Sequence, residues 1–217
     1  MPPTFLMRET WLWQLADSAF PTGGFAHSGG LEAACQLGRL HGEGALAAFL
    51  DGALWNAGRA ALPFATAAHL GDFAAADAAC DAFTLGHVAN RASRAQGRAL
   101  VRATEDAFGV RLGRAPDAPC HLAPAHGVVL ATLGAGLEET QRLFLWLTAR
   151  GVASAAVRLG LAGPAEAQGL LAAAHVTVEE ILAACASHGP QDAAQDSPLL
   201  ELFQGHQDRL YSRLFQS

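Results

Sequence analysis

The residue types that could perform hydrolysis lie close together near the start of the chain. Asp17, His27 and Ser28 are an acid, a base and a nucleophile of the kind found in a catalytic triad. The neighbours His27 and Ser28 would need converging side chains, and Ser28 lacks the G-x-S-x-G frame after a strand that marks a nucleophile elbow. We therefore expect no catalytic residue here, and a hydrolase using these three residues is the less favoured alternative.

The segment that contains these residues is better explained as a rigid turn between two helices. Residues 17–32 read DSAFPTGGFAHSGGLE, with four glycines, a proline and two phenylalanines. Glycine permits unusual dihedrals and close backbone approach, so the turn is expected to be tight and packed. The residues expected to shape this turn or an interface are Pro21, Gly23, Gly24, His27 and Ser28. Because the chain contains no lysine, a Walker-type phosphate loop and Schiff-base chemistry are excluded.

Four arginines share one side of a predicted helix: Arg91, Arg94, Arg98 and Arg102. At 3.6 residues per turn they fall within an arc of about 80°. Guanidinium groups so placed repel one another unless water or carboxylates surround them, and Glu105, Asp106 or other acidic residues of the fold are candidate partners. The face is either solvated and partly neutralised or a docking stripe for an acidic partner surface.

Nine histidines raise the question of a metal site. Imidazole suits nickel and zinc, and two ligands on one helix would be spaced i, i+4. No H-x-x-x-H pattern occurs; the nearest cluster is Cys120, His121 and His126, and Cys185 with His188 form a looser pair. We expect no metal ligand and no cofactor, with the histidines on the surface or at the edge of the core.

The end of the chain, residues 198–217, combines an apolar helical stripe with side-chain types that are enriched at interfaces. A helix is predicted over 198–212, with its stripe formed by Leu199, Leu202, Phe203, His206, Leu210 and Leu214. The residues expected to bind a partner are His206, Tyr211, Arg213, Leu214 and Phe215. Docking of this segment on the chain's own core is the alternative that the residues leave open.

The composition limits the class of protein. Half of the 217 residues are apolar, which excludes disorder for most of the chain, and the net charge of −6 argues against a nucleic-acid binder. Four cysteines without a C-x-x-C pattern are typical of free thiols in a reducing compartment. No signal peptide and no apolar run of membrane-spanning length is apparent. We expect a cytoplasmic protein that binds neither nucleic acid nor membrane.

The elements that must position these residues are predicted to be helices. One Ile, nine Val and ten Thr are few for strands, whereas Ala and Leu abound at 3.6-residue spacing. An all-α, single-domain bundle of roughly ten helices over residues 1–217 is therefore expected. The predicted helices are 8–19, 28–38, 43–60, 63–70, 72–80, 84–108, 125–135, 138–161, 165–186 and 198–212. Irregular segments are predicted at 20–30, 110–123 and 187–197.

Two of these segments resemble the signatures of a known family. Residues 15–32 are similar to the opening signature of the UreF family of urease accessory proteins, and residues 206–217 are similar to its closing signature, which ends in RLFxS. Residues 153–159 and 164–171 also suit the family, so the resemblance spans nearly the full length in the same order. Gln207 departs from the pattern, in which an acidic residue often follows His206, so no charge role is assigned there.

The resemblance implies an all-helical, non-enzymatic homodimer with several partners. These would be UreD (also called UreH), the GTPase UreG and apo-urease, and their assembly would support nickel insertion into the urease active site. The arginines of 91–102 leave a further alternative open, a GTPase-activating or GTPase-modulating protein that supplies an arginine to its partner's nucleotide site.

Overall fold

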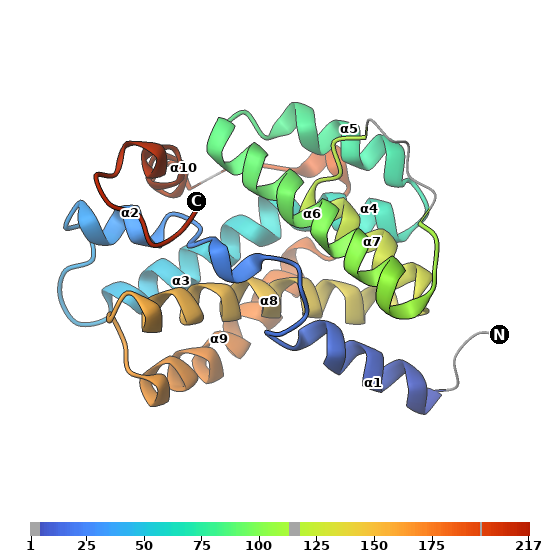
Figure 1. Cartoon of the computed structure of the whole chain (residues 1–217), viewed down its shortest axis with the longest axis horizontal. Coiled ribbons are helices and arrows are strands. Elements are labelled where there is room, and N and C mark those ends of the chain that lie inside the picture. Colours follow the sequence, from blue (N-terminus) through green and yellow to red (C-terminus); the bar gives the residue numbers. More distant parts are fainter. Residues whose placement is uncertain (1–4, 113–117, 196) are drawn as a thin grey trace.

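The structure, a computed structural model, describes residues 5–112, 118–195 and 197–217 (Figure 1). This part of the chain contains helices and no strand, which confirms the all-α prediction. The α-helices are α1 Phe5–Ala16, α2 Leu31–Gln36, α3 Ala45–Asn56, α4 Leu62–His69, α5 Phe73–Phe83, α6 His87–Phe108, α7 Leu122–Thr132, α8 Leu137–Arg158, α9 Pro164–Cys185 and α10 Pro198–His206.

Local sequence explains where several helices begin. Proline occupies the first turn of α4, α9 and α10, where its missing N–H costs no hydrogen bond. The backbone N–H of Gly136 donates to Glu139 Oε2 at 2.6 Å at the start of α8, which is one half of a capping box. Glycine ends α6, because Gly109 takes the left-handed conformation with φ of 66°.

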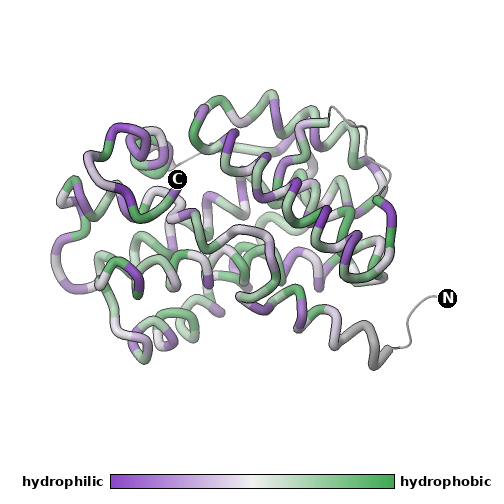
Figure 2. The backbone as a smooth tube through the Cα atoms, in the orientation of Figure 1, coloured by the Kyte–Doolittle hydropathy of each residue, from purple (hydrophilic) through white to green (hydrophobic). Residues whose placement is uncertain are grey.

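The helices surround two groups of buried side chains. The larger group joins α3, α4, α8 and α9 around Leu54, Phe64, Leu145 and Ile181. The smaller group joins the end of α1 to α6 and α7 around Leu100 and Leu130. In Figure 1, α10 lies beside α2 at one side of the molecule, and α1 lies at the other. Figure 2 shows apolar and polar residues mixed along most helices, as expected where one side of each helix is buried.

Close backbone approach between helices depends on two glycines. A Cβ atom added at Gly127 in α7 would lie 2.1 Å from the carbonyl oxygen of Ala65 in α4. One added at Gly97 in α6 would lie 2.0 Å from the carbonyl oxygen of Cys120. Neither distance is sterically allowed, so these positions set how closely α4, α6 and α7 pack.

Polar groups inside the bundle are paired with one another. The side chain of His126 donates from Nε2 to the carbonyl oxygen of Thr140 at 2.9 Å. The hydroxyl of Thr140 lies 3.0 Å from Nδ1 of His69, which links α4, α7 and α8. Gln141 donates to Thr66 at 2.9 Å and to the carbonyl oxygen of Ala186 at 2.8 Å. These bonds offset the cost of burying the groups concerned.

Most predicted helices have ends within a few residues of the observed ones, but three predictions need correction. The break expected between 43–60 and 63–70 is instead a π-helical stretch, Ala57–Ala61, that joins α3 to α4. Helix α7 begins at Leu122 rather than 125, where the backbone N–H of Leu122 donates to the Ser93 hydroxyl and that of His121 donates to Asp77. Residues 113–117 of the predicted irregular segment 110–123 lie outside the described residues.

The C-terminal helix is the third correction. It ends at His206, with a single 3-10 turn over Gln207–Arg209, rather than at 212. Within its predicted apolar stripe, Leu199 and Leu202 are exposed, whereas Phe203 packs against the core beside Leu200, which lies outside the stripe. The chain leaves the helix because the backbone groups of the last residues bond to a distant part of the chain, which is described below.

The packing at Gly127 gives a first prediction. Replacing Gly127 by Ala forces its Cβ onto the Ala65 carbonyl, and we expect a loss of about 2–3 kcal/mol in the free energy of unfolding. Gly151→Ala in α8 is the matched control, because nothing lies within 4 Å of the added Cβ and alanine favours a helix by up to about 1 kcal/mol. Urea denaturation measures both; equal stability of the two variants would contradict the packing argument.

The burial of His126 gives a second prediction, which concerns the loss of stability in acid. Burial lowers the pKa of His126 from an ordinary 6.5 to about 4, so the unfolded chain binds this proton more readily. The stability that neutral, buried His126 contributes is therefore fully present above pH 6.5 and is lost as pH falls toward 4. The gap between the two pKa values corresponds to roughly 3 kcal/mol in the free energy of unfolding. Urea denaturation between pH 7.5 and 5 should show a shallower pH dependence in His126→Gln, which keeps a donor for Thr140; an unchanged slope would refute this assignment.

Candidate functional site

A buried carboxylate, that of Glu32 in the first turn of α2, holds the end of the chain. Its Oε1 accepts the backbone N–H of Leu214 at 2.6 Å, and its Oε2 accepts that of Phe215 at 3.1 Å. The side-chain amide of Gln207 also donates to Oε2, at 2.6 Å, and donates to the carbonyl oxygen of Phe215 at 3.2 Å. Glu32 is only 2% exposed, and these charge-assisted bonds replace the water that its carboxylate loses.

The glycine-rich turn forms the rest of this attachment. The backbone N–H of Ser28 donates to the Ser217 backbone oxygen at 2.5 Å, and that of Gln216 donates to the Ala26 carbonyl oxygen at 2.7 Å. The Ser217 hydroxyl lies 2.6 Å from Nδ1 of His27. We call these contacts between residues 26–32 and residues 207–217 the tail clasp. It brings together the two segments that carry the family resemblance.

Phe215 fills the apolar part of the tail clasp. It is 4% exposed, and the guanidinium carbon of Arg158 in α8 lies 4.2 Å from the centre of its ring. Arg158 also donates to the carbonyl oxygen of Phe25 and lies 6.0 Å from the Phe25 ring. A cation over an aromatic face is attracted to it, so Arg158 ties the turn and the tail to the long helix α8.

The outer side of the same region is apolar. Leu199 and Leu202 on α10 are 64% and 66% exposed, Leu214 is 53% exposed, and Tyr211 is fully exposed. We call these four side chains the C-terminal surface. Arg213 lies beside them and bonds to Asp208, at 3.2 Å. Large apolar side chains that stay exposed on a segment whose backbone is held in place are typical of a protein-binding surface.

The structure separates the predicted partner-binding residues into two groups. Tyr211, Arg213 and Leu214 are exposed, whereas Phe215 is part of the chain's own core and His206 is half-buried. Self-docking and an outward surface therefore occur together in this segment. Partner binding by these five residues remains a prediction.

The predicted hydrolase residues do not converge. Asp17 accepts the backbone N–H of Ala19 at 2.7 Å, as a local turn does. His27 and Ser28 both bond to Ser217 rather than to each other. Each of the three side chains is thus occupied by a structural bond. Of the predicted turn residues, Gly23 takes the left-handed conformation with φ of 73°, as a tight turn requires.

The four arginines of α6 reach different partners. One guanidinium nitrogen of Arg91 donates to both carboxylate oxygens of Asp208, at 2.9 and 3.0 Å. This contact links α6 to the segment after α10. Arg94 lies 3.8 Å from Asp81, and Arg98 donates to the carbonyl oxygen of Pro119 at 3.3 Å. Arg102 is exposed and has no ion pair within the described ranges. Among the residues that the structure describes, the candidate partners Glu105 and Asp106 form no ion pair with any of the four arginines.

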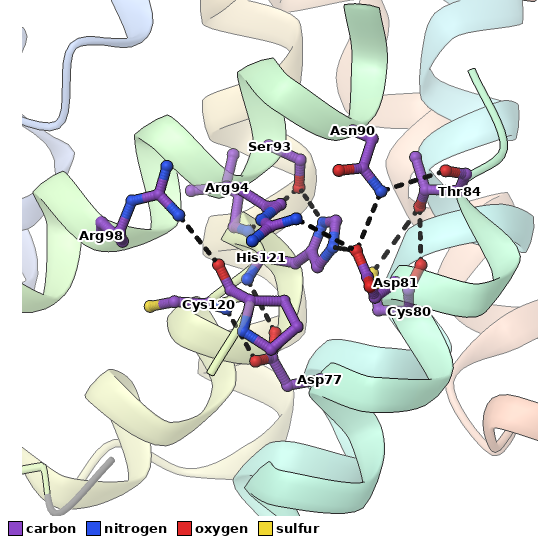
Figure 3. Close-up of polar contacts among 12 residues, drawn as sticks. Asp77, Cys80, Asp81, Thr84, Asn90, Ser93, Arg94, Arg98, Cys120 and His121 are labelled. Carbon is purple, nitrogen blue, oxygen red and sulfur yellow. Dashed lines mark hydrogen bonds and ion pairs between the residues drawn. The ribbon is translucent and has the colours of Figure 1, made fainter. Parts of the chain in front are cut away.

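A polar cluster joining α5, α6 and α7 was not predicted (Figure 3). Asp77 accepts the backbone N–H groups of Cys120 and His121, both at 2.7 Å. His121 lies 2.9 Å from Asp81 through Nε2 and 3.1 Å from Ser93 through Nδ1. Asp77 thereby holds Cys120 at a φ of 60°, a conformation that non-glycine residues rarely adopt.

The order Asp81–His121–Ser93 has the connectivity of a catalytic triad, but its setting is structural. The His121 side chain is completely buried, and the Ser93 hydroxyl accepts the backbone N–H of Leu122. The bond from His121 is the main cause that lowers the pKa of Asp81. Burial raises the pKa of the nearby Cys80 thiol to about 12, which leaves it unreactive at neutral pH. No sequence signal marked this cluster, because its members lie on three separate helices.

A metal site is not apparent in the part of the chain that the structure describes. No group of three histidine, cysteine, aspartate or glutamate residues there is placed to hold an ion. His121 and His126, which the sequence placed near Cys120, bond to Asp81 and to the Thr140 carbonyl, respectively. Nor is any described helix long and apolar enough to span a bilayer.

Comparison with known proteins assigns the chain to a family. The family model UreF matches residues 40–175. The chain belongs to the UreF family. Urease accessory protein F of Oryza sativa subsp. indica is 36% identical over 94% of this chain and 83% of its own length, and that of Arabidopsis thaliana is 36% identical over 94% and 91%. Urease accessory protein UreF of Mycobacterium sp. (strain JLS) is 37% identical over 92% and 95%.

Membership of the UreF family confirms the resemblance inferred from the two signatures. Gln207, for which the sequence indicated no charge role, has a structural one. This residue is completely buried beside the Glu32 carboxylate, where an amide can donate a hydrogen bond. An ionised acid at this position would meet a second carboxylate without a counter-charge.

The tail clasp gives a prediction about Glu32 in this UreF-family chain. Glu32→Gln places an amide where two backbone N–H groups need acceptors, at a cost of about 1–3 kcal/mol for each unpaired group. We expect the tail to detach more often and trypsin to cleave faster after Arg213 or Arg209, measured by mass spectrometry of a limited digest. Glu166→Gln is the matched control, since Glu166 also lies in the first turn of a helix, α9, but holds no tail residue there. Equal cleavage rates in the two variants would contradict this role for Glu32.

Proposed function

We propose that this chain is a non-catalytic urease accessory protein that supports nickel insertion into apo-urease. It would act in the cytoplasm as a homodimer that binds UreD (also called UreH) and the GTPase UreG, and nickel would be cargo of the assembly. The resemblance and the names of the relatives support the urease role. The observation that carries the scaffold role is the C-terminal surface, whose exposed apolar side chains lie on a segment fixed by the tail clasp.

The polar groups of the chain favour a scaffold over an enzyme. Asp17, His27 and Ser28, the residues of the less favoured hydrolase alternative, are engaged in bonds that hold the tail or a turn. In the second Asp–His–Ser arrangement the histidine is completely buried, out of reach of a substrate. These side chains stabilise the positions of helices and of the chain end.

The C-terminal surface is proposed as the contact with UreD. Its leucines and Tyr211 expose apolar area that loses contact with water only when a partner covers it. The backbone of Leu214 is already fixed by Glu32, so binding would cost less ordering entropy than docking a free tail. Tyr211 and Arg213 are of the types that dominate binding energy at protein interfaces.

A second candidate function, modulation of the GTPase by an arginine, is favoured by one observation. Arg102 is exposed on the long helix α6 and has no ion pair within the described ranges, whereas Arg91 is held by Asp208. An arginine finger needs such an exposed side chain on a rigid element. If Arg102 has this role, Arg102→Ala would reduce GTP hydrolysis by UreG in the mixture without reducing binding.

The UreD contact predicts a selective loss of binding. Leu202→Asp and Leu214→Asp each remove apolar area from the interface and bury a charge, and we expect each to weaken binding to purified UreD at least about tenfold. Leu70→Asp is the control, because Leu70 is equally exposed, at 70%, but lies at the end of α4. Isothermal titration calorimetry measures affinity, and circular dichroism checks the fold.

Deleting residues 213–217 would be a less informative test, because it also removes Phe215 from the chain's own core. Unchanged UreD binding by both aspartate variants would overturn the proposed contact. Similar weakening by Leu70→Asp would show that the effect is unspecific.

A further inference from the structure

A surface groove of about 520 Å³ lies between the end of α1 and the second half of α6. Asp17, Phe20 and Pro21 line one side, and Ala103, Asp106 and Ala107 line the other. No residue that lines the groove belongs to the C-terminal surface, so the two are separate features. A partner seated in the groove would leave the C-terminal surface free.

The walls of the groove are apolar and firmly packed. Phe20 is 8% exposed and stacks on Phe108, with ring centres 6.2 Å apart. Phe108 in turn contacts Trp11, with ring centres 5.3 Å apart. On the α6 side, Ala103 and Ala107 lie one turn apart, and their small side chains leave room for another side chain between the walls. The groove is therefore preformed rather than dependent on a rearrangement.

The rim of the groove is acidic. Asp17 and Asp106 are exposed, and Asp17 uses Oδ1 to accept the backbone N–H of Ala19. Two arginines lie near the rim. Arg150 interacts electrostatically with Asp17, but it is half-buried and donates to the Ala16 carbonyl oxygen. Arg102 lies one turn before Asp106, yet no ion pair joins the two in the described part of the chain. Asp106 is thus available to a cation from outside.

We propose that this groove binds a basic segment of a partner protein. The alkyl stem of an arginine or lysine lies against Phe20, Ala103 and Ala107, while its charged end reaches Asp106 and Asp17. A purely apolar segment fits less well, because it would cover the Asp106 carboxylate without pairing it. The net charge of −6 also favours approach of a basic partner surface. This inference rests on the proposed function, because it takes the partner to be one of the maturation proteins.

The charge part of the proposal is tested with Asp17→Asn combined with Asp106→Asn. Asparagine at position 17 keeps the acceptor for Ala19, so the turn is preserved. Binding to purified UreD, UreG and apo-urease is measured separately, and we expect one of them to bind at least about tenfold more weakly at low ionic strength. The difference should shrink as salt is added. Glu43→Gln combined with Glu180→Gln is the control, since it removes the same charge from exposed positions elsewhere.

The occupant is identified by placing the photo-cross-linking residue benzoylphenylalanine at position 107, inside the groove. Illumination of the reconstituted complex should join this position to a partner segment that contains an arginine or lysine, identified by mass spectrometry. A cross-link to a segment without a basic residue, a cross-link to a second copy of this chain, or equal affinities of the two double variants would overturn the groove proposal while the urease role stands. If the unaltered chain binds none of the three proteins, both proposals fail.

Discussion

The arrangement of the C-terminal region depends on one buried carboxylate, that of Glu32. It accepts two backbone N–H groups from the tail and the amide of Gln207, so three donors that are distant in sequence converge on one side chain. A carboxylate removed from water is stable only with such partners. The same carboxylate therefore fixes the backbone of Leu214 and Phe215 after the end of α10 and thereby the position in which Phe215 packs.

The fold class and most helix positions could be predicted because they depend on local composition. Abundant Ala and Leu, scarce β-branched residues and prolines at first turns are properties of short segments. The end of α10 could not be predicted in this way. Residues 207–212 have helical propensity and apolar spacing, but Glu32 offers acceptors that a continued helix could not reach. Tertiary hydrogen bonds decided this boundary, as did Asp77 at the start of α7.

The candidate site was only partly predictable for the same reason. The glycine-rich turn stood out as a tight structural segment, and the tail stood out as an apolar chain end. The turn and the tail contact each other across about 180 residues of sequence. The spacing of residues within either segment carries no information about such a distant contact. The predicted arginine stripe shows the converse, because four residues that share one helix face are divided among Asp208, Asp81, the Pro119 carbonyl and solvent.

The proposed contact of the C-terminal surface with UreD depends on the tail clasp, which holds that surface in place. Hydroxyl-radical footprinting of the chain alone and in its complex with purified UreD is the sharpest test of this contact, because oxidation rates report the exposure of individual side chains. We expect Leu202, Tyr211 and Leu214 to react readily in the free chain and to become protected in the complex, while Leu70 and Val176, exposed elsewhere, keep their rates. Protection confined to those other positions, with Tyr211 and Leu214 unchanged, would contradict it.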